Sequence, residues 1–494
     1  MKKIFITTPI YYPNNNLHIG HAYTTILADT YKRYKKMQGY EVFFLTGSDE
    51  HGQKIAEKAL EENKKPKEYV DKIIENFKIL WKKLNIEYDF FIRTTDNYHQ
   101  KYIQNTFVNL LSKNYIYKDN YKGLYCKYDE TFFTKNQVLE GNICPECKRK
   151  LIYLEEESYF LKVSIFKKWI IDKLKNTNLL SPNHFTKELI NNFLNDSFLD
   201  LSITRTSIDW GIKVPNDHKH VIYVWFDALL NYLSVFKTKE SKYEIEDIWS
   251  KQSEWEIIQL IGKEITRFHA IYWPIILKMK NYRLPKIIAH GWLITDQGDK
   301  MSKSKNNSID PIKLLKKYQS DEIRFYLLNN IKLGDDGKFS EKLLIKTING
   351  ILVNKYSNLV ARTDNMIRKY NNGYIPKKII ETKSEKNLER EILKLENNYY
   401  KYMDNFSIND AIDQLIKYTD ILNKYIEEKE PWKEKNQEYL NTILNFLINN
   451  IYKLSYLFSP FLPNSFKKVN MWLNDKDFSK KINKLDFLFK RIKD

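Results

Sequence analysis

The first fifty residues contain two apolar runs separated by one amphipathic segment. Residues 3–8 alternate β-branched and aromatic side chains as a buried strand does, and residues 41–46 show the same pattern. Between them, residues 22–36 carry apolar side chains at helical spacing and stop before Gly39, which is a suitable residue after a helix end. This order predicts a right-handed parallel crossover, with the N-terminus of the helix at the carboxyl edge of the sheet, where ligands bind.

The same two patterns recur further along the chain. Residues 57–84 have the apolar spacing of an amphipathic helix. Continuous apolar runs typical of buried strands cover residues 221–227, 255–262 and 285–294, and we expect them to complete the sheet. Residues 115–200 interrupt this rhythm with tyrosines and short strands, which is typical of an insertion.

The last third of the chain is helical by pattern. Apolar residues recur at helical spacing in residues 342–370, 389–403, 408–425 and 441–458, and the helical pattern continues from residue 339 to the end. We therefore predict an α/β protein in which a Rossmann-like parallel sheet with a connective insertion is followed by an all-α helical bundle. The expected parts are 1–114 (first half of the sheet domain), 115–200 (insertion), 201–297 (second half), 298–340 (loop region) and 341–494 (bundle).

Composition narrows the class of protein. The chain has 494 residues, a formal net charge of +19 and three cysteines. The charge favours a polyanionic partner, but a lysine-rich codon bias explains roughly half of the excess, so charge alone leaves nucleic-acid binding open. The sparse cysteines and the lack of an apolar run of about 18 residues predict a cytoplasmic protein without a membrane partner.

The tetrapeptide His18-Ile19-Gly20-His21 stands between the first strand and the first helix. A helix N-terminus attracts phosphate, the two histidines add donors one turn apart, and Gly20 lets a nucleotide approach the backbone. Alone, such a tetrapeptide is as readily a coincidence, but the strand before it and the helix after it favour the functional interpretation. The absence of GxGxxG and GxxxxGK[ST] argues against a dinucleotide or P-loop site.

A polar loop, residues 47–52, follows the second strand. Judged alone, its residues Asp49, Glu50 and His51 read as a solvated turn. Their expected position beside His18 at the carboxyl edge favours a functional loop instead.

The three cysteines have metal-ligand spacing. Cys126 and Asp129 form one half of a zinc-knuckle pattern, and Cys144 and Cys147 form the other. Asp129 stands where a fourth thiolate is expected, and carboxylate oxygen is also a zinc ligand. Two interpretations remain open: a Cys3Asp zinc site, or a decayed knuckle held by packing.

A second motif, Lys300-Met301-Ser302-Lys303-Ser304, follows HIGH by some 280 residues. With HIGH, it makes the sequence resemble the class I aminoacyl-tRNA synthetases. The stretches TTPIYYPNNNLHIGHAYTT, FFLTGSDEHG, VIYVWFDALLNY, RFHAIYWP, AHGWLI and EKEPW look like the methionyl-tRNA synthetase family specifically. This resemblance covers essentially the whole chain. It implies a ligase that converts L-methionine and ATP to methionyl-adenylate and pyrophosphate, then charges tRNA(Met), with Mg²⁺ as cofactor, Zn²⁺ as a further candidate, and a monomeric state.

The resemblance also implies residue roles. Methionine would be surrounded by Ile10, Tyr12, Asp49, Trp225, Ala228, Tyr232, Ile265, Phe268 and His269. ATP would be held by His18, Gly20, His21, Gly262, Glu264, His290 and Lys303, with His18, His21, Lys300, Lys303 and Arg205 as the catalytic set. The CAU anticodon would be read by Asn358, Arg362 and Trp432. The residue types fit, because a thioether favours aromatic edges and an ammonium favours a carboxylate.

Some features leave alternatives open. Glu264 stands where relatives also carry Asp, and Leu229 stands where some carry proline. Trp432 is either an exposed stacking residue or part of the bundle core. Rival functions are another class I synthetase, a small-molecule adenylyltransferase, and a tRNA-binding module without catalysis.

Overall fold

The computed structural model describes residues 1–126, 131–133, 138–145, 147–195, 198–295, 298, 301, 308–378, 380, 382–477 and 479–493. These residues form two compact units. The sheet unit comprises Met1–Leu17, Gly39–Trp81 and Glu87–His290, and the helical unit comprises His18–Gln38, Lys82–Ile86 and Gly291–Asp494.

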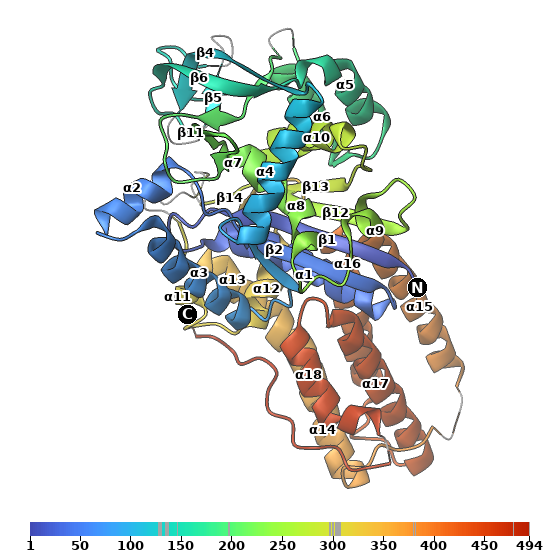
Figure 1. Cartoon of the computed structure of the whole chain (residues 1–494). Coiled ribbons are helices and arrows are strands. Elements are labelled where there is room, and N and C mark those ends of the chain that lie inside the picture. The colour runs from blue at the N-terminus through green and yellow to red at the C-terminus, as the bar shows by residue number, and fades with distance from the viewer. Residues whose placement is uncertain are drawn as a thin grey trace. The chain divides into compact units, whose positions relative to one another are not determined.

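The sheet unit is built on a six-stranded sheet whose paired strands all run parallel (Figure 1). Its strands, in spatial order, are β3 (Phe90–Arg93), β2 (Glu41–Ser48), β1 (Lys3–Tyr11), β12 (Trp255–Gly262), β13 (Lys286–His290) and β7 (Leu180–Ser181). The predicted parallel sheet is thus confirmed for the first two apolar runs and for residues 255–262. One face is covered by a single large apolar core, in which Phe5, Leu45 and Ile257 pack with side chains from several helices.

The sheet unit also contains several helices, most of which contribute side chains to this core. They are α2 (Gln53–Glu61), α3 (Pro66–Lys83), α4 (Asn97–Ser112), α5 (Lys167–Asn176), α6 (Asn183–Phe193), α9 (Ile245–Trp249) and α10 (Trp273–Met279). The prediction of one continuous helix over residues 57–84 was wrong. Helix α2 ends at Glu61, Asn63 takes a left-handed conformation with φ of 52°, and α3 begins with Pro66. Proline at the first position of a helix starts a new one, since its missing N–H is not needed there.

The interruption expected in residues 115–200 carries its own antiparallel sheet. Strands β5 (Thr131–Phe133), β4 (Ile116–Cys126), β6 (Ile152–Leu161) and β8 (Leu201–Ser202) lie in that order. A smaller antiparallel sheet of β10 (Lys213–Val214), β11 (Asp217–Ile222) and β9 (Thr204–Arg205) follows. Among the described residues, the strands of these two antiparallel sheets do not pair with the strands of the parallel sheet.

The predicted strand at residues 221–227 was wrong in part. Strand β11 ends at Ile222, belongs to the antiparallel sheet, and gives way to the short helices α7 (Val224–Leu229) and α8 (Asn231–Ser234). A buried helix of one or two turns is apolar on nearly every side, so periodicity cannot separate it from a buried strand.

The helical unit contains the predicted bundle. Its elements are α1 (Ile19–Met37), β14 (Leu293–Ile294), α11 (Pro311–Leu314), α12 (Ser320–Asn330), β15 (Gly337–Lys338), α13 (Glu341–Thr347), the π-helix η7 (Ile348–Ser357), α14 (Asn358–Asn371), α15 (Lys383–Asp404), α16 (Ile408–Lys429), α17 (Gln437–Phe458) and α18 (Pro463–Trp472). Gly39 follows α1 with φ of 82°, as its place after the helix end predicts. No helix among the described residues is both long and apolar enough to cross a bilayer.

Two expectations for this part of the chain fail. The run at residues 285–294 is split, because β14 leaves the parallel sheet and pairs with β15 instead. The helical pattern also stops before the end of the chain: after α18, one short 3-10 turn (Asn474–Lys476) is the last helical element among the described residues. Its residues Asn474 to Lys476 have positive φ, which interrupts a regular helix.

A buried ion pair ties three parts of the helical unit together. Arg324 on α12 and Asp29 on α1 are 2.7 Å apart with both side chains fully buried. The Arg324 guanidinium also donates to the Pro460 carbonyl oxygen at 2.9 Å and lies 3.4 Å from the Leu84 carbonyl oxygen. Burial is tolerated because these acceptors satisfy the charge.

Candidate active site

Two aromatic side chains form a tight stack in the sheet unit. Trp225 on α7 and Phe268 lie with ring centroids 3.7 Å apart and an angle of 4° between the ring planes. Phe268 opens the π-helix η5 (Phe268–Tyr272), which leads into α10. A π-helical turn shifts the direction of the side chains that follow it, and such turns are frequent at functional sites. The structure therefore brings together two residues predicted to contact methionine.

His269, next in the chain, is fixed by hydrogen bonds on both ring nitrogens. Its Nδ1 is 3.1 Å from the Ile265 carbonyl oxygen and its Nε2 is 2.8 Å from the Tyr232 hydroxyl. A carbonyl only accepts, so Nδ1 carries the proton and the Tyr232 O–H donates to Nε2. Burial lowers the pKa of His269 to about 4, so the ring is neutral at physiological pH. The stack thus borders a rigid, uncharged wall.

The carboxyl ends of β1 and β2 place further predicted residues. Ile10 pairs with Gly47, and a Cβ on Gly47 would overlap the Ile92 carbonyl oxygen and come within 3.0 Å of the Ile10 side chain. Asp49 follows β2, and its backbone N–H donates to the Tyr11 carbonyl oxygen at 3.0 Å. Tyr12 and Asp49 are both half-buried. Glycine at position 47 therefore permits the close approach of β2 to Ile92 on the neighbouring strand β3. The loop that carries Asp49 begins directly after this contact.

The loop after β2 is not a solvated turn. Glu50 is fully buried, and its carboxylate receives Arg93 Nε at 2.6 Å and Arg93 Nη2 at 2.8 Å. The Trp210 indole N–H donates to the Glu50 carbonyl oxygen at 2.6 Å. His51 is 4 % exposed. The loop is held from both sides, which fixes the backbone on which Asp49 sits.

Sequence reasoning missed a buried polar chain that joins this loop to α7. His51 Nδ1 lies 2.7 Å from Asp227 Oδ2, and His99 Nε2 lies 2.6 Å from Asp227 Oδ1. His99 Nδ1 in turn lies 2.6 Å from the Ser234 hydroxyl. Burial alone would raise the pKa of Asp227, but the two histidines hold it below its usual value. Asp227 therefore connects the loop of Asp49 with the helix of Trp225.

Helices α7 and α8 place Ala228 and Tyr232, and the 3-10 turn Lys263–Ile265 places Ile265. Ala228 and Tyr232 are buried, with 5 % and 1 % of their surface exposed. Ile265 is half-buried and packs against the large core of the sheet unit. The Asn231 amide donates to the Ala228 carbonyl oxygen at 2.6 Å.

A second group lies at the carboxyl ends of β12 and β13. Gly262 pairs with His290 at the end of the two strands, and Glu264 follows in an exposed turn. A Cβ on Gly262 would lie 2.5 Å from one oxygen of the Glu264 carboxylate. Glycine at this position therefore leaves room for the carboxylate to fold back over the strand end.

Arg205 is buried in the antiparallel part of the sheet unit. Its Nη1 donates to the Ser202 hydroxyl at 2.8 Å and to the Thr204 carbonyl oxygen at 2.6 Å. The guanidinium lies 4.4 Å from the Tyr223 ring centroid, and Nε is 3.7 Å from Glu156. These contacts orient the guanidinium beside α7, which begins directly after Tyr223.

In the helical unit, the HIGH motif forms the predicted helix N-terminus. His18 is the N-cap of α1: its Nδ1 accepts the Gly20 N–H at 3.1 Å, and its own N–H donates to His21 Nδ1 at 3.1 Å. The two rings stack with centroids 3.8 Å apart. Because both Nδ1 atoms accept, the proton of each neutral ring is on Nε2. A Cβ on Gly20 would lie 2.9 Å from the His18 ring. Glycine at this position therefore leaves the space that the His18 ring needs to cap the helix.

The KMSKS motif falls largely outside the described residues, including both Lys300 and Lys303. Met301 of the motif and residues 308–310 further along the chain are described. The Met301 N–H donates to the Leu293 carbonyl oxygen at 3.2 Å, and Asp310 caps α11 by accepting the Ile312 N–H at 2.8 Å. The Ile19 N–H of HIGH donates to the Ile309 carbonyl oxygen at 3.0 Å. The chain that leaves KMSKS is thus hydrogen-bonded to HIGH.

The three cysteines converge. The Sγ atoms of Cys126, Cys144 and Cys147 lie within 4.8 Å of one another, and Cys126 Sγ is 3.4 Å from Cys147 Sγ. A disulfide needs about 2.05 Å between sulfurs, so these three side chains are not joined by disulfides. Leu124, Phe133 and Leu151 form a small core around them. Asp129, the expected fourth ligand, lies outside the described residues.

The predicted anticodon residues gather at one end of two bundle helices. Asn358 is exposed at the start of α14, and the Arg362 guanidinium lies 6.0 Å from the Trp432 ring centroid and 4.0 Å from Glu427. Trp432 is 46 % exposed, so it does not pack in the bundle core. Helix α16 ends at a left-handed Glu430, and the chain then turns through Pro431 to present the indole outward.

Comparison with known proteins places the chain in a family. The sequence model of the family described as "tRNA synthetases class I (M)" matches residues 4–153 and 149–364. The chain belongs to this family of class I tRNA synthetases, which confirms the resemblance seen in the sequence.

Individual relatives are named more narrowly. A methionine–tRNA ligase of Clostridium tetani is 43% identical over 484 residues, covering 96% of this chain and 74% of that protein. A methionine–tRNA ligase of Mycoplasmopsis pulmonis is 41% identical over 511 residues, covering 100% of this chain and 99% of the relative. The solved structure of Mycobacterium tuberculosis methionyl-tRNA synthetase in complex with methionyl-adenylate superposes with a TM-score of 0.91 at 31% identity, covering 99% of this chain and all of that chain.

Proposed function

We propose that this protein activates L-methionine with ATP and transfers it to tRNA(Met), the reaction of a methionine–tRNA ligase. The observation that carries the proposal is the Trp225–Phe268 stack beside a neutral, doubly hydrogen-bonded His269. The aromatic rings suit the polarizable thioether of methionine. A neutral His269 also avoids the cost of burying an unpaired charge beside an apolar side chain. The names of the relatives in the same family support the same amino acid.

In the sheet unit, we assign methionine to the residues around this stack. Ile10, Tyr12, Ala228, Tyr232 and Ile265 complete the apolar and hydroxyl lining, and the Asp49 carboxylate is the partner for the α-ammonium group. Such a pocket gains specificity from preorganisation, because a side chain held in place loses little freedom when substrate binds. Gly262, Glu264 and His290 are assigned to ATP, with the Glu264 carboxylate accepting hydrogen bonds from ribose hydroxyls.

In the helical unit, we assign the phosphates of ATP to HIGH and KMSKS. The N-terminus of α1 and the Nε2–H groups of His18 and His21 offer donors to phosphate oxygens, and Lys300 and Lys303 add positive charge. We assign Arg205 of the sheet unit to the reacting groups. Mg²⁺ prefers phosphate and carboxylate oxygens and would enter with ATP.

The reaction needs no covalent protein intermediate. A methionine carboxylate oxygen attacks the α-phosphorus of ATP, and the bond to the bridging oxygen of pyrophosphate breaks. A hydroxyl of the terminal ribose of tRNA then attacks the carbonyl carbon of the adenylate, and AMP leaves. The protein contributes orientation and neutralises charge on the phosphorus in the transition state.

The cysteine cluster fits zinc by its donor set. Thiolates about 2.3 Å from a tetrahedral zinc ion lie about 3.8 Å from one another, which is close to the spacing of the three sulfurs. Zinc held by Cys126, Cys144 and Cys147, with Asp129 as the candidate fourth ligand, would stabilise the fold of the insertion. Elemental analysis of protein purified without chelator should give one equivalent of zinc. Less than a tenth of an equivalent, with unchanged melting after chelation, would favour the decayed knuckle.

For tRNA, we assign the anticodon to Asn358, Arg362 and Trp432. An exposed indole next to a guanidinium gives a stacking surface and donors for unpaired bases. We expect the protein to be a monomer and to act in the cytoplasm. The oligomeric state and the location are both predictions.

A pyrophosphate–ATP exchange assay without tRNA tests the proposal. Each of the twenty amino acids is offered separately, and methionine alone should support exchange. Exchange with a different amino acid would indicate another class I synthetase. If no amino acid supports exchange, the result would favour an adenylyltransferase that acts on another kind of substrate, or a tRNA-binding module without catalysis.

A further inference from the structure

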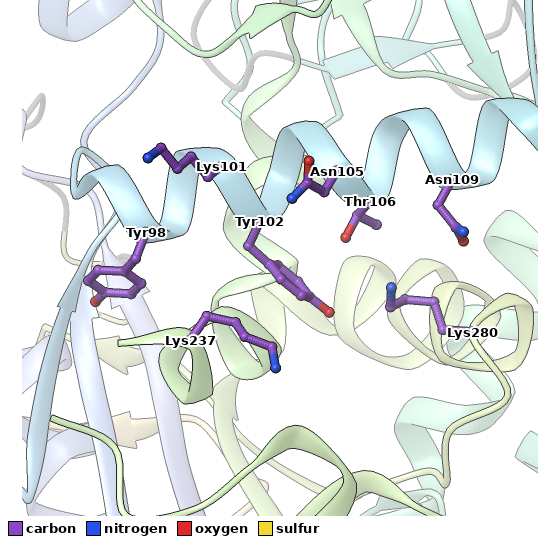
Figure 2. A pocket seen from close by; sticks show the side chains of 8 residues that line it. All are labelled: Tyr98, Lys101, Tyr102, Asn105, Thr106, Asn109, Lys237 and Lys280. Carbon is purple, nitrogen blue, oxygen red and sulfur yellow. The ribbon is translucent and has the colours of Figure 1, made fainter. Parts of the chain in front are cut away.

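A cavity of about 440 Å³ lies in the sheet unit, apart from every residue assigned above. Its lining comes from α4, from the end of the 3-10 turn η3 (Val235–Lys237), and from the residue that follows α10. The residues are Tyr98, Lys101, Tyr102, Asn105, Thr106, Asn109, Lys237 and Lys280. Figure 2 shows the Tyr102 hydroxyl lying in the space between the side chains of Lys237 and Lys280.

The lining is cationic. Three of its eight residues are lysines and none is acidic. Carboxylates also lie nearby: Glu244 is 3.2 Å from Lys237 Nζ, burial and then Asp96 raise the pKa of Tyr98, and Glu246 raises that of Tyr102. Lys101 and Lys280 have no carboxylate within ion-pair distance in the described part of the chain. The cavity therefore has a surplus of positive charge.

Lys280 differs from the other two lysines of the lining because it is half-buried, whereas Lys101 and Lys237 are exposed. Its Nζ lies 5.4 Å from the Tyr102 ring centroid and 5.9 Å from the Tyr282 ring centroid. Burial and then the Lys113 ammonium lower the pKa of Lys280 to about 8, against a smaller opposing effect of Glu246. The Glu246 carboxylate accepts the Tyr282 hydroxyl at 3.2 Å. An ammonium in this position gains more from an anion than an exposed lysine does.

The tyrosines add a donor and apolar surface. The Tyr102 hydroxyl oxygen is buried, and its polar neighbour is the Thr106 side chain, which also lines the cavity. Burial raises the pKa of Tyr102, so this hydroxyl keeps its proton and remains a donor. The rings of Tyr98 and Tyr102 also line the cavity. A phosphate oxygen is a charged acceptor, and a hydrogen bond to a charged acceptor is stronger than one between neutral groups.

We propose that this cavity binds a small organic phosphate, with the phosphate group between Lys280, Lys237 and the Tyr102 hydroxyl and the organic part against the tyrosine rings. A phosphate monoester carries nearly two negative charges and three acceptor oxygens, which match these donors. The volume is that of a small-molecule site. An RNA backbone binds along exposed tracks of lysine, and a half-buried lysine beside a buried hydroxyl favours a compact ligand instead.

Titration calorimetry with phenyl phosphate tests this proposal on the full chain at pH 7, with inorganic phosphate and benzyl alcohol as separate probes. Phenyl phosphate should bind with a stoichiometry of one and more tightly than inorganic phosphate, and benzyl alcohol should not bind. Lys280→Gln should weaken phenyl phosphate binding by about tenfold or more, because hydrogen bonds to charged groups are among the stronger ones. Lys280→Arg, which keeps the charge, should retain most of the affinity.

Lys278→Gln is the matched control, since Lys278 stands two residues before Lys280, at the end of α10, but is exposed and does not line the cavity. It should bind phenyl phosphate as the unsubstituted protein does. The affinity should also fall as pH rises from 7 to 9, and this fall should vanish in Lys280→Gln. Methionine-dependent exchange should be the same in all three variants, so a failed exchange assay and a failed binding assay are distinguishable.

Three results would overturn the proposal. The first is no binding of phenyl phosphate at millimolar concentration by a protein that melts normally. The second is equal affinity in Lys280→Gln and Lys278→Gln. The third is a raised KM for tRNA in Lys280→Gln without phenyl phosphate binding, which would mark the lysines as an RNA contact.

Discussion

Trp225 and Trp432 are two tryptophans that we assign to substrate sites, and their settings are opposite. Trp225 is half-buried against Phe268, in a segment whose neighbours are held by the chain from His51 through Asp227 to Ser234. Trp432 is 46 % exposed on a turn, with a guanidinium 6.0 Å from its ring centroid. The first setting suits a small ligand that must be enclosed in one geometry, and the second suits a large ligand that arrives with its own folded shape.

This contrast predicts that the sheet unit couples stability to its pocket while the bundle surface does not. Substitutions near Trp225 should change folding and the first step of the reaction. Substitutions at Trp432 should change the tRNA-dependent step alone.

The largest effect is expected for Asp227→Ala. It removes the shared partner of two buried histidines and should lower the free energy of unfolding by about 3–5 kcal/mol. Urea denaturation of the full chain measures this. Asp227→Asn, which keeps one acceptor, should lose less. A loss below 1 kcal/mol for the alanine variant would show that the buried chain does not hold the loop to α7.

Trp225→Ala should lower kcat/KM for methionine in the exchange assay by about 10- to 100-fold, or about 1.4–2.8 kcal/mol. The reason is loss of one face of the aromatic stack. Trp169→Ala is the matched control, because Trp169 is a half-buried tryptophan of the same unit on α5. Comparable losses in both variants would point to a general packing defect.

Trp432→Ala should weaken aminoacylation of tRNA(Met) by about 5- to 150-fold in kcat/KM, since stacking on one base is about 1–3 kcal/mol. Exchange without tRNA and the melting temperature should not change. If all three measurements fall together, Trp432 supports the bundle and the anticodon assignment rests on Asn358 and Arg362.

The smallest effect at neutral pH concerns His269. Its pKa is lowered by burial from 6.5 to about 4, so below pH 6.5 the unfolded chain takes up a proton that the folded chain does not. Stability therefore falls as pH drops from 6.5 towards 4, by at most about 1.4 kcal/mol per pH unit from this group. His269→Gln should flatten that part of the profile relative to the unsubstituted protein. An unchanged slope would mean that His269 is already charged when folded.

The sequence predicted the elements whose patterns are long. The parallel sheet followed from apolar runs of six to eight residues, the bundle helices followed from longer periodic runs, and Asp310-Pro311 marked a true helix start. Residues 221–227 failed because a short buried helix has no polar face to show its period. Residues 57–84 failed because the break at Asn63 and Pro66 was outweighed by the surrounding helical spacing.

The candidate site divides in the same way. HIGH was predicted as a helix N-terminus because its local context defines it, and the structure adds that His18 caps the helix. The chain through His99 and Asp227 was not predictable, because its members stand 128 residues apart and each alone looks like a core polar residue. Only tertiary contacts join them. An aspartate inside an otherwise apolar run, as in VIYVWFD, is the one local signal that such a partner exists.

The convergence of the cysteines has a practical consequence. The chain contains three cysteines and all of them lie in one cluster, so every thiol of the protein reports on the same few ångströms of the insertion. A maleimide reagent added to the native protein would read out the opening of this knuckle without engineered labels. Its rate of modification, followed by mass spectrometry, would give the local opening free energy of the insertion separately from global unfolding.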